Sequence, residues 1–263
     1  VLARFLTDYS EDELRNCVET AYSKDRFGDF PAPLHLLKDN LDVLELWHGP
    51  TCAFKDMALQ ILPLFLTKAV QKTGEQKKLV ILVATSGDTG KAAMAGFADV
   101  PETEVIVFYP QEGVSDIQKL QMVTQKGDNV HAVAVEGNFD DAQTGVKILF
   151  GSQPLAQELQ EHGCAFSSAN SINWGRLVPQ IVYYFSAYAD AVNSGRIENG
   201  APVNFAVPTG NFGDILAGFY ARLMGLPVNK FICASNSNNV LTDFINTGVY
   251  NRKRPFHKTI SPS

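Results

Sequence analysis

One lysine stands out in the segment "HGPTCAFKDMALQ", residues 48–60, because it lies between a Gly/Pro turn and an apolar stretch. Phe54 precedes Lys55, and Asp56 follows it. A lysine near a helix start is ordinarily a solvated cation. An apolar neighbour that removes water favours the neutral amine instead, and a neutral amine is a nucleophile. The segment by itself leaves both interpretations open.

Two glycine-bearing loops are candidates for binding anions. The first, "TSGDTG" at 85–90, lies between an apolar strand and a small-residue helix, where hydroxyls and the amides of a helix start favour negative charge. The second, "PTGNFGD" at 208–214, has the same strand-to-helix position, and Gly210 and Gly213 let the backbone approach a ligand closely. It lacks the spacing of dinucleotide and nucleotide-triphosphate loops, so it suits a single phosphate. A tight turn without a ligand is the alternative for each loop.

Together these three features predict a cofactor. A lysine amine, a hydroxyl-rich anion loop and a phosphate cup match what pyridoxal 5'-phosphate requires, since the amine binds its aldehyde and the cup holds its phosphate. For that work the amine of Lys55 has to lose its proton, and an apolar neighbour such as Phe54 would promote the loss.

Alternating strands and helices would position these loops. The continuous apolar run "KLVILVAT", 78–85, is typical of a strand covered on both faces. Further strands are expected at 42–47, 104–110, 129–135, 165–170 and 229–236 and in "VNFAVP", with helices between them. One helix is expected over 56–72, where Pro63 predicts a kink or a later start. The order predicts an α/β fold of two lobes, each a mainly parallel sheet flanked by helices, with ligands at the carboxyl ends of the strands.

Composition limits the classes of function. The chain of 263 residues has 22 basic and 28 acidic residues and a net charge of −6, which argues against nucleic-acid or acidic-membrane partners. Neither a membrane span nor a signal peptide is indicated. The 4 cysteines lack paired spacing, so we expect reduced thiols in a cytoplasmic protein and neither a disulfide frame nor a metal site. Because the chain opens without methionine and ends after a turn-rich run, we expect a piece of a longer polypeptide.

Four motifs stand in the same order as in a known family. The segments "ELWHGPTCAFKDMALQ", "ATSGDTGKAA", "NSINWGRLVPQ" and "VPTGNFGDILAG" together resemble threonine synthase, a fold-type II pyridoxal-phosphate enzyme related to the tryptophan synthase β-chain. The resemblance implies that Lys55 is the catalytic lysine and the covalent attachment point of the cofactor. It also implies a cofactor phosphate cup made of Gly210, Asn211, Phe212, Gly213 and Asp214. Implied substrate contacts are Ser86, Asp88, Thr89, Asn173 and Arg176, whereas His48 is expected to be structural.

The implied reaction converts O-phospho-L-homoserine and water to L-threonine and phosphate, the work of a carbon–oxygen lyase. Lys55 would remove the α-proton, a β-proton and the γ-phosphate would follow, and water would add at Cβ. Two phosphates, one on the cofactor and one on the substrate, account for more than one anion-binding loop. The expected partner is thus a small phosphorylated amino acid, and the oligomeric state is not indicated.

The resemblance also divides the chain. Residues 1–77 and 171–263 would belong to a large lobe, and 78–170 would form a small lobe between them. Family members are expected to extend beyond both ends, and no residue here is assigned to face the pyridine nitrogen. Two alternatives stay open: a phospho-lyase of the same family that releases a keto acid, and a truncated, non-catalytic member that acts as an interaction protein. A serine/threonine dehydratase matches "HGPTCAFKD" and "SINWGR" less well.

Overall fold

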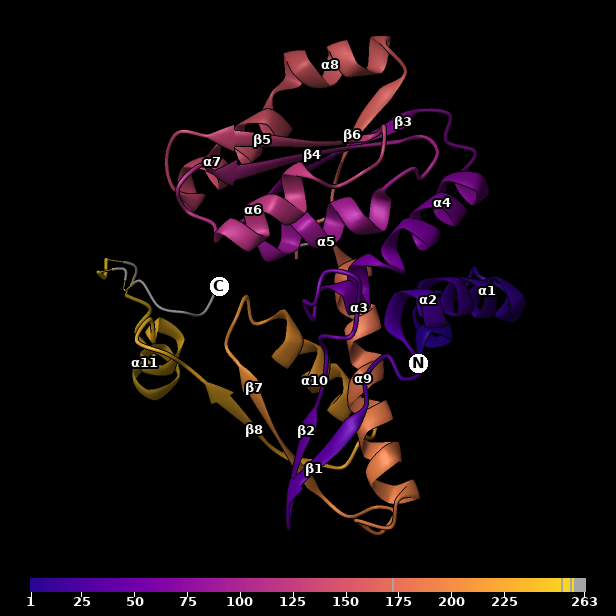
Figure 1. The fold of residues 1–263 in the computed structure, drawn as a ribbon, viewed down its shortest axis with the longest axis vertical. Helices are drawn as coiled ribbons and strands as arrows, with labels where there is room; N and C mark the ends of the chain where they lie inside the picture. Colours follow the sequence, from indigo (N-terminus) through magenta and orange to yellow (C-terminus); the bar gives the residue numbers. More distant parts are fainter. Residues whose placement is uncertain (172, 252, 256, 258–263) are drawn as a thin grey trace. The chain divides into compact units, whose positions relative to one another are not determined.

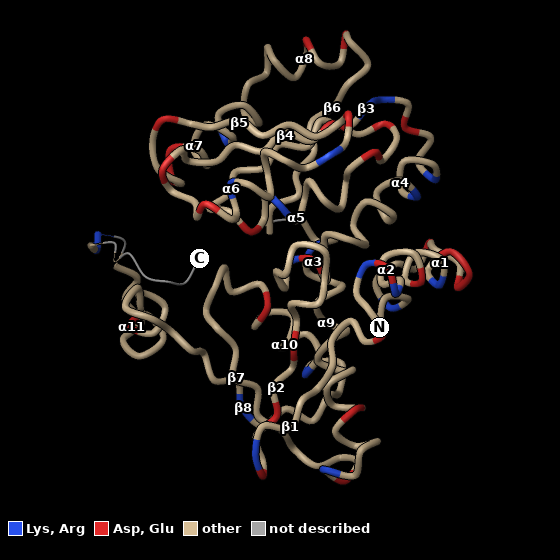
Figure 2. Tube along the Cα trace, in the orientation of Figure 1, with Lys and Arg blue, Asp and Glu red and all other residues tan. Residues whose placement is uncertain are grey.

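The computed structural model describes residues 1–171, 173–251, 253–255 and 257 (Figure 1). Ile172, within the third motif, lies outside these residues. The chain divides into two compact units, Val1–Pro179 and Gln180–Ser263. Acidic and basic residues are interspersed along the chain rather than gathered in long stretches of one sign (Figure 2). No helix in the described part of the chain is long and apolar enough to cross a lipid bilayer.

The first unit contains a short hairpin and a four-stranded sheet. Its strands are β1 (Leu34–Lys38), β2 (Leu41–Leu44), β3 (Lys78–Ala84), β4 (Thr103–Pro110), β5 (Val130–Val135) and β6 (Cys164–Ser168). Its helices are η1 (Leu2–Arg4), α1 (Glu11–Ala21), α2 (Lys24–Phe27), α3 (Asp56–Leu59), α4 (Leu62–Thr73), α5 (Asp88–Phe97), α6 (Asp116–Val123), α7 (Phe139–Gly151), α8 (Gln153–Glu161) and the start of α9 (Trp174–Asn193).

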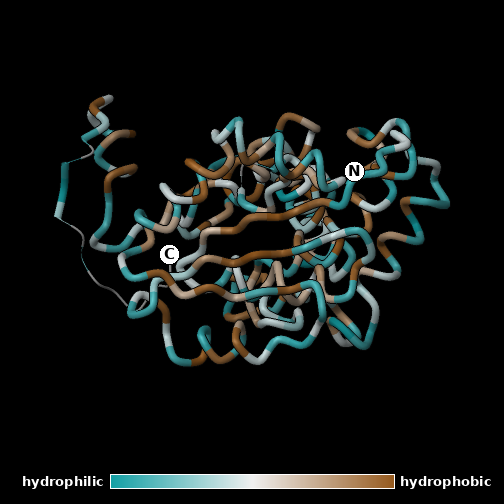
Figure 3. The backbone as a smooth tube through the Cα atoms, turned by 90° about the horizontal axis from the view of Figure 1, so that it is seen from above, coloured by the Kyte–Doolittle hydropathy of each residue, from teal (hydrophilic) through white to brown (hydrophobic). Residues whose placement is uncertain are grey.

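The larger sheet has the strand order β5-β4-β3-β6, and its three strand pairs are all parallel. All four carboxyl ends therefore point to one edge, and the loop that leads from β3 into α5 starts there. The strands are hydrophobic along most of their length (Figure 3).

Side chains of β3 alternate between two covered faces. Ile81 and Val83 lie in one core cluster with Phe97 of α5, and Leu82 lies in another with Val146 of α7. Helices on both faces explain why this strand is apolar without interruption. The prediction of a parallel sheet flanked by helices is confirmed here.

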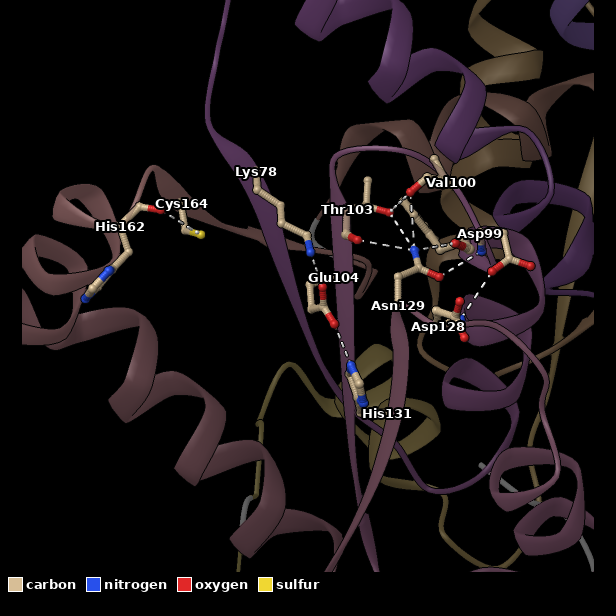
Figure 4. Close-up of polar contacts among 11 residues, drawn as sticks. Lys78, Asp99, Val100, Thr103, Glu104, Asp128, Asn129, His131, His162 and Cys164 are labelled. Atoms are coloured by element: carbon tan, nitrogen blue, oxygen red, sulfur yellow. Dashed lines mark hydrogen bonds and ion pairs between the residues drawn. The ribbon is translucent and has the colours of Figure 1, made fainter.

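The amino-terminal edge of this sheet is held by polar contacts (Figure 4). Glu104 of β4 forms an ion pair with Lys78 of β3 and lies 2.5 Å from Nε2 of His131 on β5. Nearby, Nδ2 of Asn129 donates to the carbonyl oxygen of Phe97 and to Oγ1 of Thr103, each at 3.0 Å. These contacts tie β3, β4, β5 and the end of α5 together.

Two expectations about the first 77 residues need correction. The helix expected over 56–72 is two helices, α3 and α4, and Pro63 lies in the first turn of α4, where its missing N–H is not needed. The strand expected at 42–47 ends at Leu44, and it pairs antiparallel with β1, which periodicity did not predict.

The second unit is built on two parallel strands, β7 (Val203–Pro208) and β8 (Val228–Ala234), joined through α10 (Gly213–Leu223). It also contains the rest of α9, and α11 (Val240–Thr247) follows β8. Tyr184 of α9 packs edge-on against Phe205 of β7, with ring centroids 4.9 Å apart. This contact fixes the helix against the strand that leads to the second glycine loop.

Candidate active site

Lys55 is buried. It directly precedes α3, it is 5% exposed, and its Nζ lies 4.6 Å from the centroid of the Phe54 ring. Of the two interpretations of this lysine, a solvated surface cation is therefore wrong. The apolar ring excludes water on one side of the amine, which is the environment that a reactive lysine needs.

The turn before Lys55 is locked by the next side chain in sequence. The carboxylate of Asp56 is fully buried and accepts hydrogen bonds from the backbone N–H and from Oγ1 of Thr51, each at 2.8 Å. A Cβ on Gly49 would lie 2.5 Å from Cβ of Asp56, so only glycine fits there. Burial raises the pKa of Asp56 although the Thr51 bonds act in the opposite direction. The Gly49 to Asp56 segment thus presents Lys55 in one fixed orientation.

Asp88, the first residue of α5, faces two lysines. Its Oδ2 lies 3.5 Å from Nζ of Lys55, and its Oδ1 lies 3.3 Å from Nζ of Lys91. The side chain of Gln118, on α6, donates from Nε2 to the same Oδ1 at 2.9 Å. Burial by itself would raise the pKa of Asp88, but Lys55, Gln118 and Lys91 together lower it. Asp88 is therefore a carboxylate at neutral pH.

The 85–90 loop uses part of its own anion-binding capacity. Oγ1 of Thr85 accepts hydrogen bonds from the amides of Gly87 and Gly90, each at 2.9 Å. Two of the amides expected to be available for an anion are therefore already satisfied. Thr89 is buried and Ser86 is half-buried in this loop.

The connection from β6 to α9 is also held by side chains. Nδ2 of Asn173 donates to the carbonyl oxygen of Ser168 at 2.8 Å, and Nη1 of Arg176 donates to that of Ala169 at 2.7 Å. Burial lowers the pKa of Arg176 to about 10, so this side chain, 4% exposed, stays a cation at neutral pH. Asn170 ties the connection to the end of β3, because its Nδ2 donates to the carbonyl oxygen of Ala84 at 3.1 Å.

Three members of this site had no assigned part in the sequence-based prediction: Lys91, Gln118 and Asn170. Only Lys91 carries a sequence signal, its position three residues after Asp88 at a helix start, where the two side chains share a face.

His48 contacts its neighbours in sequence. Its Nε2 lies 2.7 Å from Oε2 of Glu45, and its ring stacks on Trp47.

The second glycine loop is described within its own unit. Gly210 has φ +43° and Phe212 has φ +65°, and α10 begins at Gly213. A Cβ on Gly210 or on Gly213 would meet no atom within 4 Å, so space is open beside the backbone at both positions. Asn211 is exposed, and Oδ1 of Asp214 accepts from the amide of Ile215 at 2.8 Å. An open turn that leads into a helix start fits a phosphate group.

The chain matches the family described as pyridoxal-phosphate dependent enzyme over residues 32–263. It is 47% identical over 263 residues to human threonine synthase-like 1, covering 97% of this chain and 35% of that protein. It is 46% identical over 238 residues to threonine synthase of Pseudomonas aeruginosa, covering 89% of this chain and 47% of that enzyme. The chain thus spans about a third to a half of the length of these curated relatives.

Solved structures agree with the sequence comparison. A pyridoxal-phosphate-bound threonine synthase from Brucella melitensis superposes with a TM-score of 0.87 at 40% identity, covering 100% of this chain and 54% of that one. Yeast threonine synthase gives a TM-score of 0.85 at 37% identity, covering 98% of this chain and 50% of that one.

The chain belongs to the family of pyridoxal-phosphate dependent enzymes. Within that family it is a threonine synthase-like protein of fold type II. The resemblance noted in the four motifs is thereby confirmed, and pyridoxal phosphate is confirmed as the cofactor on which this family depends.

Proposed function

We propose that this chain forms the cofactor-binding part of a threonine synthase, which converts O-phospho-L-homoserine and water to L-threonine and phosphate. The observation that carries the proposal is Lys55, a buried amine set between Phe54 and Asp88 in a chain of the pyridoxal-phosphate family. Both covalent cofactor binding and proton transfer require a buried lysine whose neighbours fix its position.

The proposal gives the chain's groups separate tasks. Nζ of Lys55 would hold the cofactor and, once released from it, would take the proton from Cα of the substrate. The cup that holds the cofactor phosphate consists of Gly210, Asn211, Phe212, Gly213 and Asp214. Open space at both glycines and the first amides of α10 support this assignment. The bound cofactor supplies a ring that spreads the negative charge left at Cα.

The substrate side involves groups from two strand-to-helix junctions. Ser86 lies in the loop that follows β3, and Asp88 and Thr89 begin α5. Asn173 lies in the connection from β6 to α9, and Arg176 lies in the first turn of α9. Arg176 stays cationic although it is buried, which supports a role in stabilising the departing phosphate. The hydrogen bond from Arg176 to Ala169 and that from Asn173 to Ser168 hold these two side chains in place before substrate arrives.

The lobe boundaries belong to the same proposal. Residues 1–77 and 171–263 would make the large lobe and 78–170 the small lobe, so that Lys55 and the cup serve one cofactor. We also propose a cytoplasmic location, supported by the free thiols of Cys17, Cys52, Cys164 and Cys233.

Product analysis tests the proposal. The chain, loaded with pyridoxal phosphate and given O-phospho-L-homoserine, should release L-threonine and phosphate. Lys55→Ala should abolish turnover, whereas Lys147→Ala, a change at an exposed position of α7, should not. Release of a keto acid with phosphate would favour the phospho-lyase alternative. A folded chain that neither binds the cofactor nor turns over would contradict the proposal and favour a non-catalytic interaction protein.

A further inference from the structure

Two buried lysines, one of them the proposed reactive Lys55, share the carboxylate of Asp88. Asp88 lies within 3.5 Å of Nζ of Lys55 and within 3.3 Å of Nζ of Lys91, and the two lysines are 5% and 7% exposed. The proposed function uses only Lys55 as an amine. A buried cation is costly unless it is paired, and the partner of Lys91 is the same carboxylate that faces Lys55, so the charges of the two lysines are coupled.

The charges in this cluster that the described contacts identify are those of Lys55 and Asp56, in the turn and α3, and of Asp88 and Lys91, in α5. The charge of Lys91 also acts on the carboxyl group of Asp56, which is fully buried. Helix α6 presents a neutral amide, Gln118, which donates to Asp88. The four charges sum to zero when both lysines are protonated and both acids are ionised.

The sum of these charges changes when Lys55 loses its proton in order to act as a nucleophile or a base. A lysine has to be neutral to bind an aldehyde or to accept a proton. A lone carboxylate at 3.5 Å would oppose that loss of charge, because it stabilises the ammonium form. Lys91 works against this effect in two ways: it satisfies the same carboxylate, and it repels a second positive charge nearby.

We infer that Lys91 is a positioning residue that keeps Asp88 paired while Lys55 gives up its proton, and so makes the neutral amine of Lys55 accessible near pH 7. This inference rests on the proposed function of Lys55. Gln118 supports the same arrangement, since it fixes the oxygen of Asp88 that faces Lys91.

The direction of the effect follows from the charges. Without Lys91, Asp88 has Lys55 as its only cationic partner among these groups, so the ammonium form of Lys55 gains stability. The pH at which half of Lys55 reacts should then rise by on the order of one unit, the size expected for one nearby charge. Removing the charge of Asp88 should move the same midpoint downward.

Competitive acetylation with acetic anhydride across pH, read on the Lys55 peptide by mass spectrometry, measures this midpoint without any cofactor. The variants are Lys91→Met, Lys91→Arg, Asp88→Asn and, as a matched control, Lys147→Met on the exposed face of α7. We expect an upward shift in Lys91→Met, near-parental values in Lys91→Arg and Lys147→Met, and a downward shift in Asp88→Asn. Asp88→Asn provides a second reading of opposite sign should Lys91→Met fail to fold.

An unchanged midpoint in folded Lys91→Met would overturn the inference, and so would an equal shift in Lys147→Met. If Lys91→Met does not fold, an unchanged midpoint in Asp88→Asn would overturn it. A different outcome would contradict the proposed function alone. If pyridoxal phosphate cannot be trapped on Lys55 of the parent chain while the acetylation midpoints shift as expected, the charge balance stands and the enzyme proposal does not.

Discussion

A single pair of side chains, Thr51 and Asp56, determines how Lys55 enters α3. Thr51 supplies two donors to a carboxylate with no exposed surface, one from its backbone and one from Oγ1. Burial raises the pKa of Asp56, and the two hydrogen bonds from Thr51 act in the opposite direction because they stabilise the carboxylate. The fixed turn then places Lys55 against Phe54 and Asp88.

Thr51→Val should therefore destabilise the chain by about 1–3 kcal/mol, because a buried acceptor loses a donor that water cannot replace. Thr73→Val is the control: Thr73 is exposed at the end of α4, and its Oγ1 donates only to carbonyl groups of its own helix. Urea unfolding monitored by circular dichroism gives both values. Equal losses in the two variants would show that the Thr51 bond has no special part in the turn.

The sequence predicted some of these residues and missed others for a physical reason. A lysine between Phe54 and an apolar stretch can be recognised locally, because its neighbours in sequence are its neighbours in space. That Asp88 meets Lys55, or that Thr85 takes the amides of Gly87 and Gly90, depends on how β3 and α5 pack. No spacing pattern carries that information.

Helices α3 and α5 approach each other at a glycine. A Cβ on Gly96 would lie 2.0 Å from the backbone oxygen of Leu59, so the two helices could not keep their distance with any other residue. This packing matters for function because α3 follows Lys55 and α5 carries Asp88 and Lys91. The close approach holds the three charged groups within reach of one another.

We predict that Gly96→Ala costs more than about 2 kcal/mol of unfolding free energy, because the added methyl group meets backbone atoms and forces the helices apart. Gly145→Ala makes the same change in α7, where a Cβ meets nothing within 4 Å. It should stabilise the chain by about 0.5–1 kcal/mol through helix propensity. Thermal unfolding of both variants is the measurement, and a stabilising Gly96→Ala would contradict the close packing.

The contacts of Glu104 with Lys78 and His131, at the amino-terminal edge of the larger sheet, predict that stability depends on pH. The hydrogen bond from Lys78, assisted by His131, lowers the pKa of Glu104. A carboxyl group with a lowered pKa contributes stability above its unfolded value, about 4.3, and that contribution is lost as the pH falls through the folded value. These contacts of Glu104 should therefore stabilise the sheet at neutral pH and lose that effect in acid.

Glu104→Gln should cost under about 1 kcal/mol at pH 7, and the difference from the parent should shrink toward pH 3. Urea titrations at several pH values would measure it, with Glu158→Gln, at an exposed position of α8, as the control. A difference that stays constant across this range would show that ionisation of Glu104 adds nothing to the strand contacts.

Element types were largely predictable, and their interruptions were not. Capping boxes start α1 at Ser10 and α6 at Ser115, and the spacing that forms them can be read from the sequence. The break between α3 and α4 was one of two outcomes that Pro63 allowed, and apolar periodicity alone could not choose between them. The strand at 42–47 was expected, but its partner β1 was not, because β1 is short and mostly exposed.

For the molecule as a whole, the proposal requires Lys55 and the glycine cup to serve one cofactor. Each group has a natural thiol nearby. Cys52, which is exposed, lies three residues before Lys55, and Sγ of Cys233 lies 3.4 Å from Oγ1 of Thr209, next to Gly210. These thiols can report on occupancy at both places in the same experiment.

Because the proposal assigns Lys55 and the glycine cup to one cofactor, pyridoxal phosphate should slow alkylation of Cys52 and Cys233 together. Cys164, which belongs to β6, provides the internal control and should react at an unchanged rate. Mass spectrometry of the separate peptides gives all three rates. Protection of Cys52 without protection of Cys233 would argue against a shared cofactor.

The identity of the lysine that binds the cofactor decides whether Lys55 is the reactive amine. The chain is incubated with pyridoxal phosphate, reduced with borohydride and digested, and the labelled peptide is sequenced by mass spectrometry. We predict a pyridoxyl group on Lys55 and none in Lys55→Ala, with Lys91 and Lys119 unlabelled in both. A label on Lys91 or Lys119 of the parent chain, or an undiminished label in Lys55→Ala, would contradict this prediction.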